Sequence, residues 1–191
     1  MQLQGYFLGE HGFFDKRLIY EESLRMPFVI RYPKEIEAGA RIKEMILNID
    51  FAPLMADYAG IEKPIYMQGK SFRALLNGKK TLPWRNEIYY RYWLHHPDRP
   101  AHFGIRNERY KLAYFYGKGL NKKGVHPTHT KPEWEFYDLQ EDPKENYNAI
   151  ANPKYKELIK NMKTALIKLR EQYGDTDPDH PELQLAISQE P

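Results

Sequence analysis

The sequence predicts an α+β fold in which one long helix packs on a four-stranded antiparallel sheet. Four segments with the aromatic or alternating pattern of strands follow one another between residues 87 and 139, without a helix between them. An apolar stripe then runs through residues 153–173 at helical spacing. A chain of 191 residues, 41% of them hydrophobic, is long enough to bury a core between these two layers.

The predicted strands cover residues 87–93, 102–106, 110–116 and 133–139. Asn107-Glu108-Arg109 lies between the second and third and indicates a hairpin. Asn152 before Pro153 predicts the start of the long helix, and Gly174 its end. The following residues, 176–191, contain three prolines and little pattern, so we expect a loosely ordered tail.

The first 82 residues have weaker signals. Three glycines in residues 5–17 predict a loop, and residues 18–25 a short helix. The β-branched and aromatic run 28–32 predicts a buried strand. A helix is expected to begin at Asp50 as N-cap, with a second short helix over 71–76.

Composition excludes several classes of protein. Cysteine is absent, which excludes disulfides, thiolate metal sites and cysteine nucleophiles. The formal charge of +3 does not by itself favour a nucleic-acid partner, and the apolar runs are too short to span a membrane. The first residues lack the basic and apolar regions of a signal peptide.

Three groups of residues could carry chemistry. The cluster of Glu10, His11, Asp15 and Lys16 can bind an anion or move protons, although its spacing alone favours a surface loop with ordinary ion pairs. Aromatic residues surround three histidines, a composition suited to carbohydrate binding; a zinc site or solvated histidines are the alternatives. The basic loop 118–131 could meet an acidic polysaccharide or simply be solvated. The three histidines are His95, His96 and His102.

Five segments in order resemble one family, the formylglycine-dependent sulfatases. Residues 5–33 contain GEHGFFDK followed by YEESLRMP, which match G-E-H-G-x-x-x-K and Y-E-x-x-x-R-x-P of that family. The similarity extends over about residues 4–174, and GEHGFFDKR with YWLHHP is most similar to the branch acting on 6-sulfated N-acetylglucosamine. The other four segments are IDFAPLMADYAG (49–60), QGKSF (68–72), RNERYKL (106–112) and EFYDLQEDP (135–143) with Asn148.

The resemblance implies roles for individual residues. Lys16 matches the lysine that contacts the substrate sulfate, and His11 with Glu10 supports its loop. Gln4 matches a ligand position of the family's Ca²⁺ site, but Leu3 stands where an aspartate ligand is expected, so we expect no tight calcium binding. The substrate-binding candidates are His95, His96, His102 and Arg106.

The family's nucleophile has no counterpart here. Formylglycine is made from Cys or Ser in C/S-x-P-x-R, and none of Ser23, Ser71 and Ser188 begins such a motif. The resemblance therefore implies the C-terminal part of an alkaline-phosphatase-like sulfatase that is inactive as an isolated chain. Complete family members use formylglycine and Ca²⁺, and we expect neither in this chain. Family members are typically exported, so we expect a periplasmic or secreted location, although this chain has no signal peptide of its own.

This interpretation gives a domain division and an alternative. Residues 1–82 would be the residual edge of the large α/β domain, with exposed apolar surface, and residues 83–175 the sheet subdomain. The expected partners are a sulfated carbohydrate and either a missing N-terminal sulfatase half or a second copy, but no nucleic acid and no membrane. The alternative is a stand-alone module that binds sulfated glycans without catalysis, through Lys16, the histidines and the basic loop; a split reading frame would also explain the chain.

Overall fold

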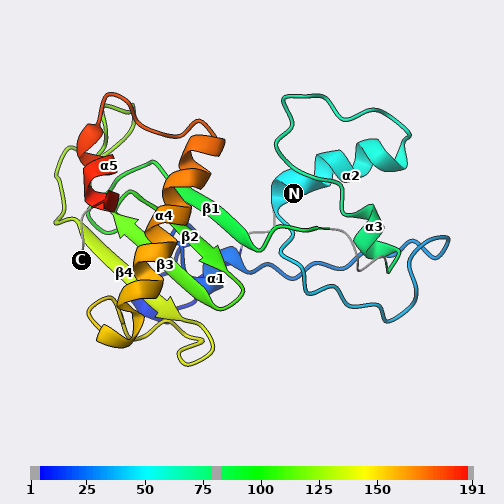
Figure 1. Ribbon diagram of the computed structural model, residues 1–191, viewed down its shortest axis with the longest axis horizontal. Coiled ribbons are helices and arrows are strands. Elements are labelled where there is room, and N and C mark those ends of the chain that lie inside the picture. The colour runs from blue at the N-terminus through cyan, green and yellow to red at the C-terminus, as the bar shows by residue number, and fades with distance from the viewer. Residues whose placement is uncertain (1–4, 79–82, 189–191) are drawn as a thin grey trace. The chain divides into compact units, whose positions relative to one another are not determined.

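The computed structural model describes residues 5–78 and 83–188 and divides into two compact units (Figure 1). The sheet unit is drawn from residues 1–27 and 87–191, and the middle unit from residues 28–86. This differs from the predicted division at residue 82. The loop segment at the start of the chain belongs with the sheet because Phe7, Leu18 and Ile19 are buried in one cluster with Ala113 and Phe115.

The sheet has the predicted four strands and antiparallel order. Among the described residues the order is β1-β2-β3-β4, with β1 at Glu87–Tyr92, β2 at His102–Asn107, β3 at Tyr110–Phe115 and β4 at Glu133–Asp138. The β2–β3 turn is closed by Asn107, whose Oδ1 accepts hydrogen bonds from the backbone N–H groups of Arg109 (3.0 Å) and Tyr110 (2.7 Å). The hairpin expected at these residues is confirmed.

The two faces of the sheet are covered by different segments. The short helix η3 (Pro153–Tyr155) leads into α4 (Lys156–Gln172), which crosses one face in Figure 1. Asn152 accepts from the N–H of Lys154 (3.0 Å), as expected of the N-cap. Side chains alternate along a strand. Leu112 therefore lies in the hydrophobic cluster that contains Ile159, Met162 and Leu166 of α4 (the α4 cluster), while Ala113 lies in the cluster on the opposite face. That second face carries the segment with η1 (Glu10–Gly12) and α1 (Glu21–Leu24).

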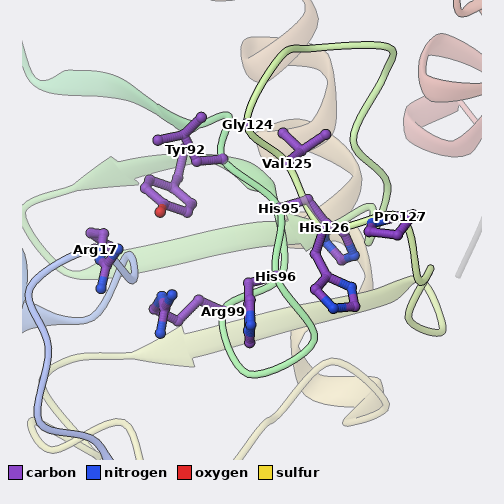
Figure 2. A pocket seen from close by; sticks show the side chains of 10 residues that line it. Arg17, Tyr92, His95, His96, Arg99, Gly124, Val125, His126 and Pro127 are labelled. Atoms are coloured by element: carbon purple, nitrogen blue, oxygen red, sulfur yellow. The ribbon is translucent and has the colours of Figure 1, made fainter.

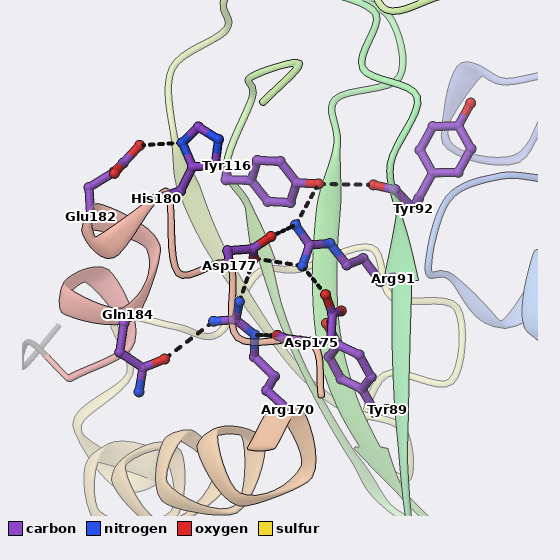
Figure 3. Close-up of polar contacts among 10 residues, drawn as sticks. All are labelled: Tyr89, Arg91, Tyr92, Tyr116, Arg170, Asp175, Asp177, His180, Glu182 and Gln184. Carbon is purple, nitrogen blue, oxygen red and sulfur yellow. Dashed lines mark hydrogen bonds and ion pairs between the residues drawn. The ribbon is translucent and has the colours of Figure 1, made fainter. Parts of the chain in front are cut away.

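Residues 176–188 differ from the predicted loose tail. They contain α5 (Pro181–Ser188), whose Leu183 and Ile187 are buried in the α4 cluster. The turn before α5 is held by Asp177, which accepts hydrogen bonds from Arg91 on β1 (2.6 Å) and Arg170 on α4 (2.5 Å; Figure 3). The prolines in this segment form a turn and a helix start and do not leave it unpacked.

The middle unit contains η2 (Asn48–Asp50), α2 (Phe51–Tyr58) and α3 (Arg73–Leu76) around a small core. Asp50 does not cap α2 through its side chain, contrary to expectation. Its buried carboxylate instead pairs with Arg85 and accepts from the N–H groups of Leu47 and Lys70, both at 2.8 Å. It therefore ties three segments of the unit together.

The strand predicted for residues 28–32 is wrong. The segment has no regular structure, and Val29 is 92% exposed. A strand needs a hydrogen-bonded neighbour, and no strand is described between residues 28 and 78. The exposed apolar surface expected in this half of the chain is confirmed by Val29, Ile65 and Tyr66. No helix of the described residues is long and apolar enough to cross a bilayer.

Candidate functional site

The loop that carries the first predicted cluster is held in a tight backbone conformation. Phe7 donates its N–H to the carbonyl of Asp15 (2.7 Å) and Gly9 to that of Phe13 (2.9 Å), which closes the loop on itself. Gly9 and His11 both have positive φ angles, 121° and 53°, which glycine adopts easily and histidine rarely. The His11 ring is stacked on Tyr20 with centroids 4.3 Å apart. This contact attaches the loop to Tyr20, and the supporting role assigned to His11 stays a prediction.

Lys16 is presented to solvent by a fixed backbone. Its N–H donates to Oδ1 of Asp15 (2.5 Å), and its carbonyl accepts from Oγ of the buried Ser23 (2.6 Å). The side chain itself is exposed, and within the described residues no carboxylate pairs with it. An ammonium group without a partner on a fixed backbone is suited to bind an anion. The sulfate contact assigned to Lys16 stays a prediction.

Asp15 organises the residues on both sides of Lys16. It is 6% exposed and binds Arg17 through two hydrogen bonds of 2.7 and 2.6 Å, while Nε of Arg99 lies 3.3 Å from its Oδ2. Burial opposes ionisation, but the hydrogen bonds from Arg17 and Lys16 outweigh it and hold the pKa of Asp15 below its usual value. One carboxylate thus positions two guanidinium groups.

Both arginines line an open cleft of about 310 Å³ in the sheet unit. Figure 2 shows Arg17, Arg99, His96 and His126 following one another along its lower side, with Tyr92 above. The cleft lies where β1 ends and meets the basic loop 118–131. Its complete lining is Arg17, Tyr92, Leu94, His95, His96, Arg99, Gly124, Val125, His126 and Pro127.

His96 and His126 present hydrogen-bond donors to this cleft. Nδ1 of His96 accepts from the N–H of Asp98, and Nδ1 of His126 from that of Thr128, both at 3.2 Å. A neutral imidazole whose Nδ1 accepts carries its proton on Nε2, so both rings offer an Nε2–H donor. The two rings are in edge contact, 5.0 Å apart. Donors beside the Tyr92 ring suit a sugar that carries oxyanions.

His95 lines the cleft but its polar atoms are already engaged. The residue is 2% exposed; Nε2 lies 2.7 Å from the carbonyl oxygen of Thr128, and Nδ1 accepts from the N–H of Ala101 at 3.3 Å. Its own carbonyl accepts from the N–H of His126 (2.8 Å). These contacts attach the basic loop to the end of β1. Substrate binding by His95 stays a prediction that its geometry does not favour.

His102 lies away from the cleft lining, in the sheet. Its ring is fully buried between Tyr90, Tyr92 and Phe115, and its Nδ1 lies 2.7 Å from the carbonyl of Pro100. Burial lowers the pKa of His102 to about 4. The ring is therefore neutral at pH 7, and substrate binding by His102 stays a prediction.

Arg106, the fourth substrate-binding candidate, is engaged in a buried ion-pair network. It forms two hydrogen bonds with Glu21, of 2.7 and 2.8 Å, and Lys111 bridges Glu21 to Glu145. Burial opposes the ionisation of Glu21, but the bonds from Arg106 and the charge of Lys111 lower its pKa to about 2. The network attaches α1, and with it the Lys16 segment, to the sheet. Contact of Arg106 with substrate stays a prediction.

The metal position cannot be assembled from the described residues. Gln4, the predicted family ligand position, lies outside them. Within residues 5–78 and 83–188, no group of three or more His, Asp or Glu side chains could hold a metal ion. Ca²⁺ usually needs six or more oxygen ligands, and the expectation of no tight calcium binding stays a prediction.

Sequence reasoning did not single out Arg17 or Arg99, included Tyr92 only among the aromatic residues around the histidines, and placed His126 only in the basic loop. The signal for Arg17 was its position in the Asp15-Lys16-Arg17 run, in which Asp15 and Arg17 pair with each other and Lys16 between them is exposed. Arg99 gave no such signal, because its link to Asp15 depends on the fold.

Comparison with known proteins gives consistent matches. Residues 9–172 match the family described as N-sulphoglucosamine sulphohydrolase, C-terminal. An N-acetylglucosamine-6-O-sulfatase of Bacteroides thetaiotaomicron is 40% identical over 183 residues, which are 94% of this chain and 31% of that protein. An ulvan-active sulfatase of Formosa agariphila is 32% identical over 179 residues, covering 82% and 36% of the two chains.

A solved structure described as a complex with its substrate D-glucosamine-2-N,6-O-disulfate is also similar. It superimposes with a TM-score of 0.80 at 40% identity, covering 92% of this chain and 34% of that one. The chain thus spans about a third of the length of these relatives.

Proposed function

Because the chain belongs to the sulfatase family of N-sulphoglucosamine sulphohydrolase C-terminal regions, we propose that it supplies the sulfate-binding lysine and part of the sugar pocket of a sulfatase. The proposed ligand is a 6-sulfated N-acetylglucosamine, in keeping with the 40% identity to an N-acetylglucosamine-6-O-sulfatase. The observation that carries the proposal is the exposed Lys16 ammonium on a backbone fixed by Asp15 and Ser23.

Lys16 would act on the sulfate group electrostatically. Its positive charge offsets the charge of the bound sulfate and the charge that develops on the leaving oxygen. The neighbouring cleft would hold the sugar, with Tyr92 as an apolar ring and the Nε2–H groups of His96 and His126 as donors to hydroxyl groups.

We further propose that the isolated chain does not hydrolyse sulfate esters. It has no cysteine from which formylglycine could be made. Of its serines, Ser23 is buried and donates to the Lys16 carbonyl, and Ser71 donates to Asp57 (2.6 Å). The attacking group would come from residues outside these 191. Leu8 and Phe14, each 73% exposed beside the Lys16 segment, support a part of the enzyme that covers them.

The test is a calorimetric titration of the 191-residue chain with 6-sulfated N-acetylglucosamine, which measures the dissociation constant. Lys16→Ala should weaken binding by about tenfold or more, the usual range for a charged hydrogen bond. Lys34→Ala removes the same charge from another exposed position and should leave the affinity unchanged. Equal affinities of wild type and Lys16→Ala would contradict the role of Lys16.

A sulfate-ester turnover assay tests the inactivity. The purified chain should release no sulfate above the buffer rate, with or without added Ca²⁺. Metal-dependent turnover would show that the chain holds a nucleophile that we have not identified.

A stand-alone glycan-binding module would use the same residues and give the same titration. Its distinguishing outcome is that hydrolysis never appears when the catalytic N-terminal part of a related sulfatase is added to the chain. Complementation to an active enzyme would exclude this alternative.

A further inference from the structure

Arg99 has hydrogen-bonding capacity that nothing in the described part of the chain uses. Its Nε lies 3.3 Å from Oδ2 of Asp15, and the buried Nε makes no hydrogen bond of good geometry. No acceptor within residues 5–78 or 83–188 lies against its terminal nitrogens. The side chain is 26% exposed and lines the cleft. A guanidinium group in this state has its paired terminal donors available to a ligand.

The charges around Arg99 do not cancel. Asp15 supplies one negative charge, and Arg17 already uses both of its carboxylate oxygens. Two guanidinium groups on one carboxylate leave a net positive charge in the cleft. Asp98 precedes Arg99 in the chain, but its side chain is 77% exposed and lies 3.4 Å from Nδ1 of His96. The site is therefore cationic.

The other polar groups of the cleft add to the donors. With the rings neutral, His96 and His126 both point a protonated Nε2 away from their own turns, as their Nδ1 atoms already accept. A pocket of donors without matching acceptors is complementary to an oxyanion, because only the ligand can then complete the hydrogen bonds.

We propose that Arg99, flanked by Arg17 and His96, is a second anion-binding position, so that the preferred ligand is a sugar with two oxyanion groups. The inference rests on the proposed function, in which Lys16 binds the first oxyanion group, the 6-sulfate. Lys16 does not line the cleft. The same buried carboxylate fixes both positions, because Asp15 accepts the N–H of Lys16 and pairs with Arg99.

The second oxyanion can be a sulfate or a carboxylate. A guanidinium fork binds either in a bidentate manner, and the structure contains nothing that selects one by charge. The test therefore uses three ligands: 6-sulfated N-acetylglucosamine, glucosamine 2-N,6-O-disulfate, and 6-sulfated N-acetylglucosamine linked to a uronic acid. The first carries one oxyanion, the second two sulfates, and the third a sulfate and a carboxylate.

The measurement is the dissociation constant of each ligand for the full chain at one fixed ionic strength. The wild type should bind at least one doubly charged ligand about 10-fold to 100-fold more tightly than the singly charged one. The doubly charged ligand that binds more tightly shows whether the second oxyanion is a sulfate or a carboxylate. Arg99→Gln should bring this ratio close to one while changing the affinity for the singly charged ligand by less than about twofold.

Two variants control for charge and folding. Arg99→Lys keeps the charge and the pairing with Asp15 but loses the fork, so its ratio should lie between those of wild type and Arg99→Gln. Arg41→Gln removes one exposed arginine elsewhere and should keep the wild-type ratio. Amide spectra of each variant matching the wild type establish that it is folded. Equal losses for all three ligands in Arg99→Gln would overturn the inference.

The outcomes separate this inference from the proposed function. If the wild type binds the singly charged sugar through Lys16 but gains nothing from a second oxyanion, the inference is wrong and the function stands. If no sugar binds, the proposed function is wrong. A titration with inorganic sulfate, monitored by NMR at the Arg99 Nε–H resonance, then tests separately whether Arg99 binds an anion. A saturable shift of this resonance that an equal concentration of chloride does not cause supports the inference, and no saturable shift overturns it.

Discussion

Nε2 of the buried His95 lies 2.7 Å from the carbonyl oxygen of Thr128, and Nδ1 of the same ring accepts the N–H of Ala101. The ring thus joins the end of β1 to the basic loop 118–131, whose His126 also donates its N–H to the His95 carbonyl. This makes His95 a positioning residue for the cleft.

His95→Ala should release the loop without unfolding the sheet. It leaves the buried N–H of Ala101 and the carbonyl of Thr128 without their side-chain partner, and the unpaired buried N–H alone costs about 1–3 kcal/mol. We expect the exchange of the His126 and Thr130 amides to become at least about tenfold faster, while the β3 amides keep their protection. Hydrogen exchange measured by NMR provides this comparison.

Two other variants sharpen the test. His95→Gln retains a side-chain donor of similar reach and should restore part of the protection. His129→Ala removes an exposed histidine of the same loop and should have no effect. If the His126 and Thr130 amides exchange at the wild-type rate in His95→Ala, the backbone hydrogen bonds of the loop are enough to keep it in place.

His102 should make the folded chain sensitive to acid. Its pKa in the folded state is about 4, against an ordinary value of 6.5, so the unfolded chain binds the proton first. The free energy of unfolding therefore decreases as the pH falls from about 6.5 to 4. By pH 4.5 this one group accounts for roughly 2–3 kcal/mol, from the difference between the two pKa values.

The check is urea unfolding of wild type and His102→Phe at pH 7 and pH 4.5. Phe keeps the stacking with Tyr90, Tyr92 and Phe115 but cannot be protonated. The variant should lose less stability between the two pH values than the wild type. The exposed His129→Gln should follow the wild type, and parallel losses in His102→Phe would contradict the burial of a neutral ring.

The strands and the long helix could be predicted because their signals are local. Alternation in residues 87–139 and the stripe from Tyr155 to Leu169 each describe one element, and the sulfatase motifs fixed the α+β fold class that the comparisons confirm. The segment 28–32 has the same β-branched character but lacks a partner strand, which no local pattern records.

The candidate site was less accessible to sequence reasoning. His95 and His96 are adjacent and identical in kind, yet one is 2% exposed and the other has 37% of its side chain exposed. Their difference depends on Thr128 and Ala101, which meet His95 only in the folded chain. The pairing of Asp15 with Arg99 is equally non-local, so the sequence pointed to Lys16 as a candidate sulfate contact but not to the cationic cleft lined by Arg99.

Asp177 should be the residue that keeps α5 on the sheet unit (Figure 3). It accepts from Arg91 at 2.6 and 2.9 Å and from Arg170 at 2.5 Å, and these arginine side chains are only 4% and 1% exposed. Asp177→Ala would leave two buried positive charges without this partner, which typically costs about 3–5 kcal/mol. We expect α5 to detach and its peptide bonds to become sensitive to limited proteolysis.

Two variants separate charge from backbone conformation in this turn. Asp177 has a φ of 49°, which asparagine also tolerates, so Asp177→Asn removes the charge but keeps the conformation. It should lose most of the stability that Asp177→Ala loses, because both arginines still lack the Asp177 carboxylate and only Arg91 keeps another, that of Asp175 at 2.6 Å. Asp179→Ala, at an exposed position of the same turn, should be as stable as wild type. If Asp177→Asn keeps full stability and protease resistance, the packing of Leu183 and Ile187, and not the ion pairs, holds α5 in place.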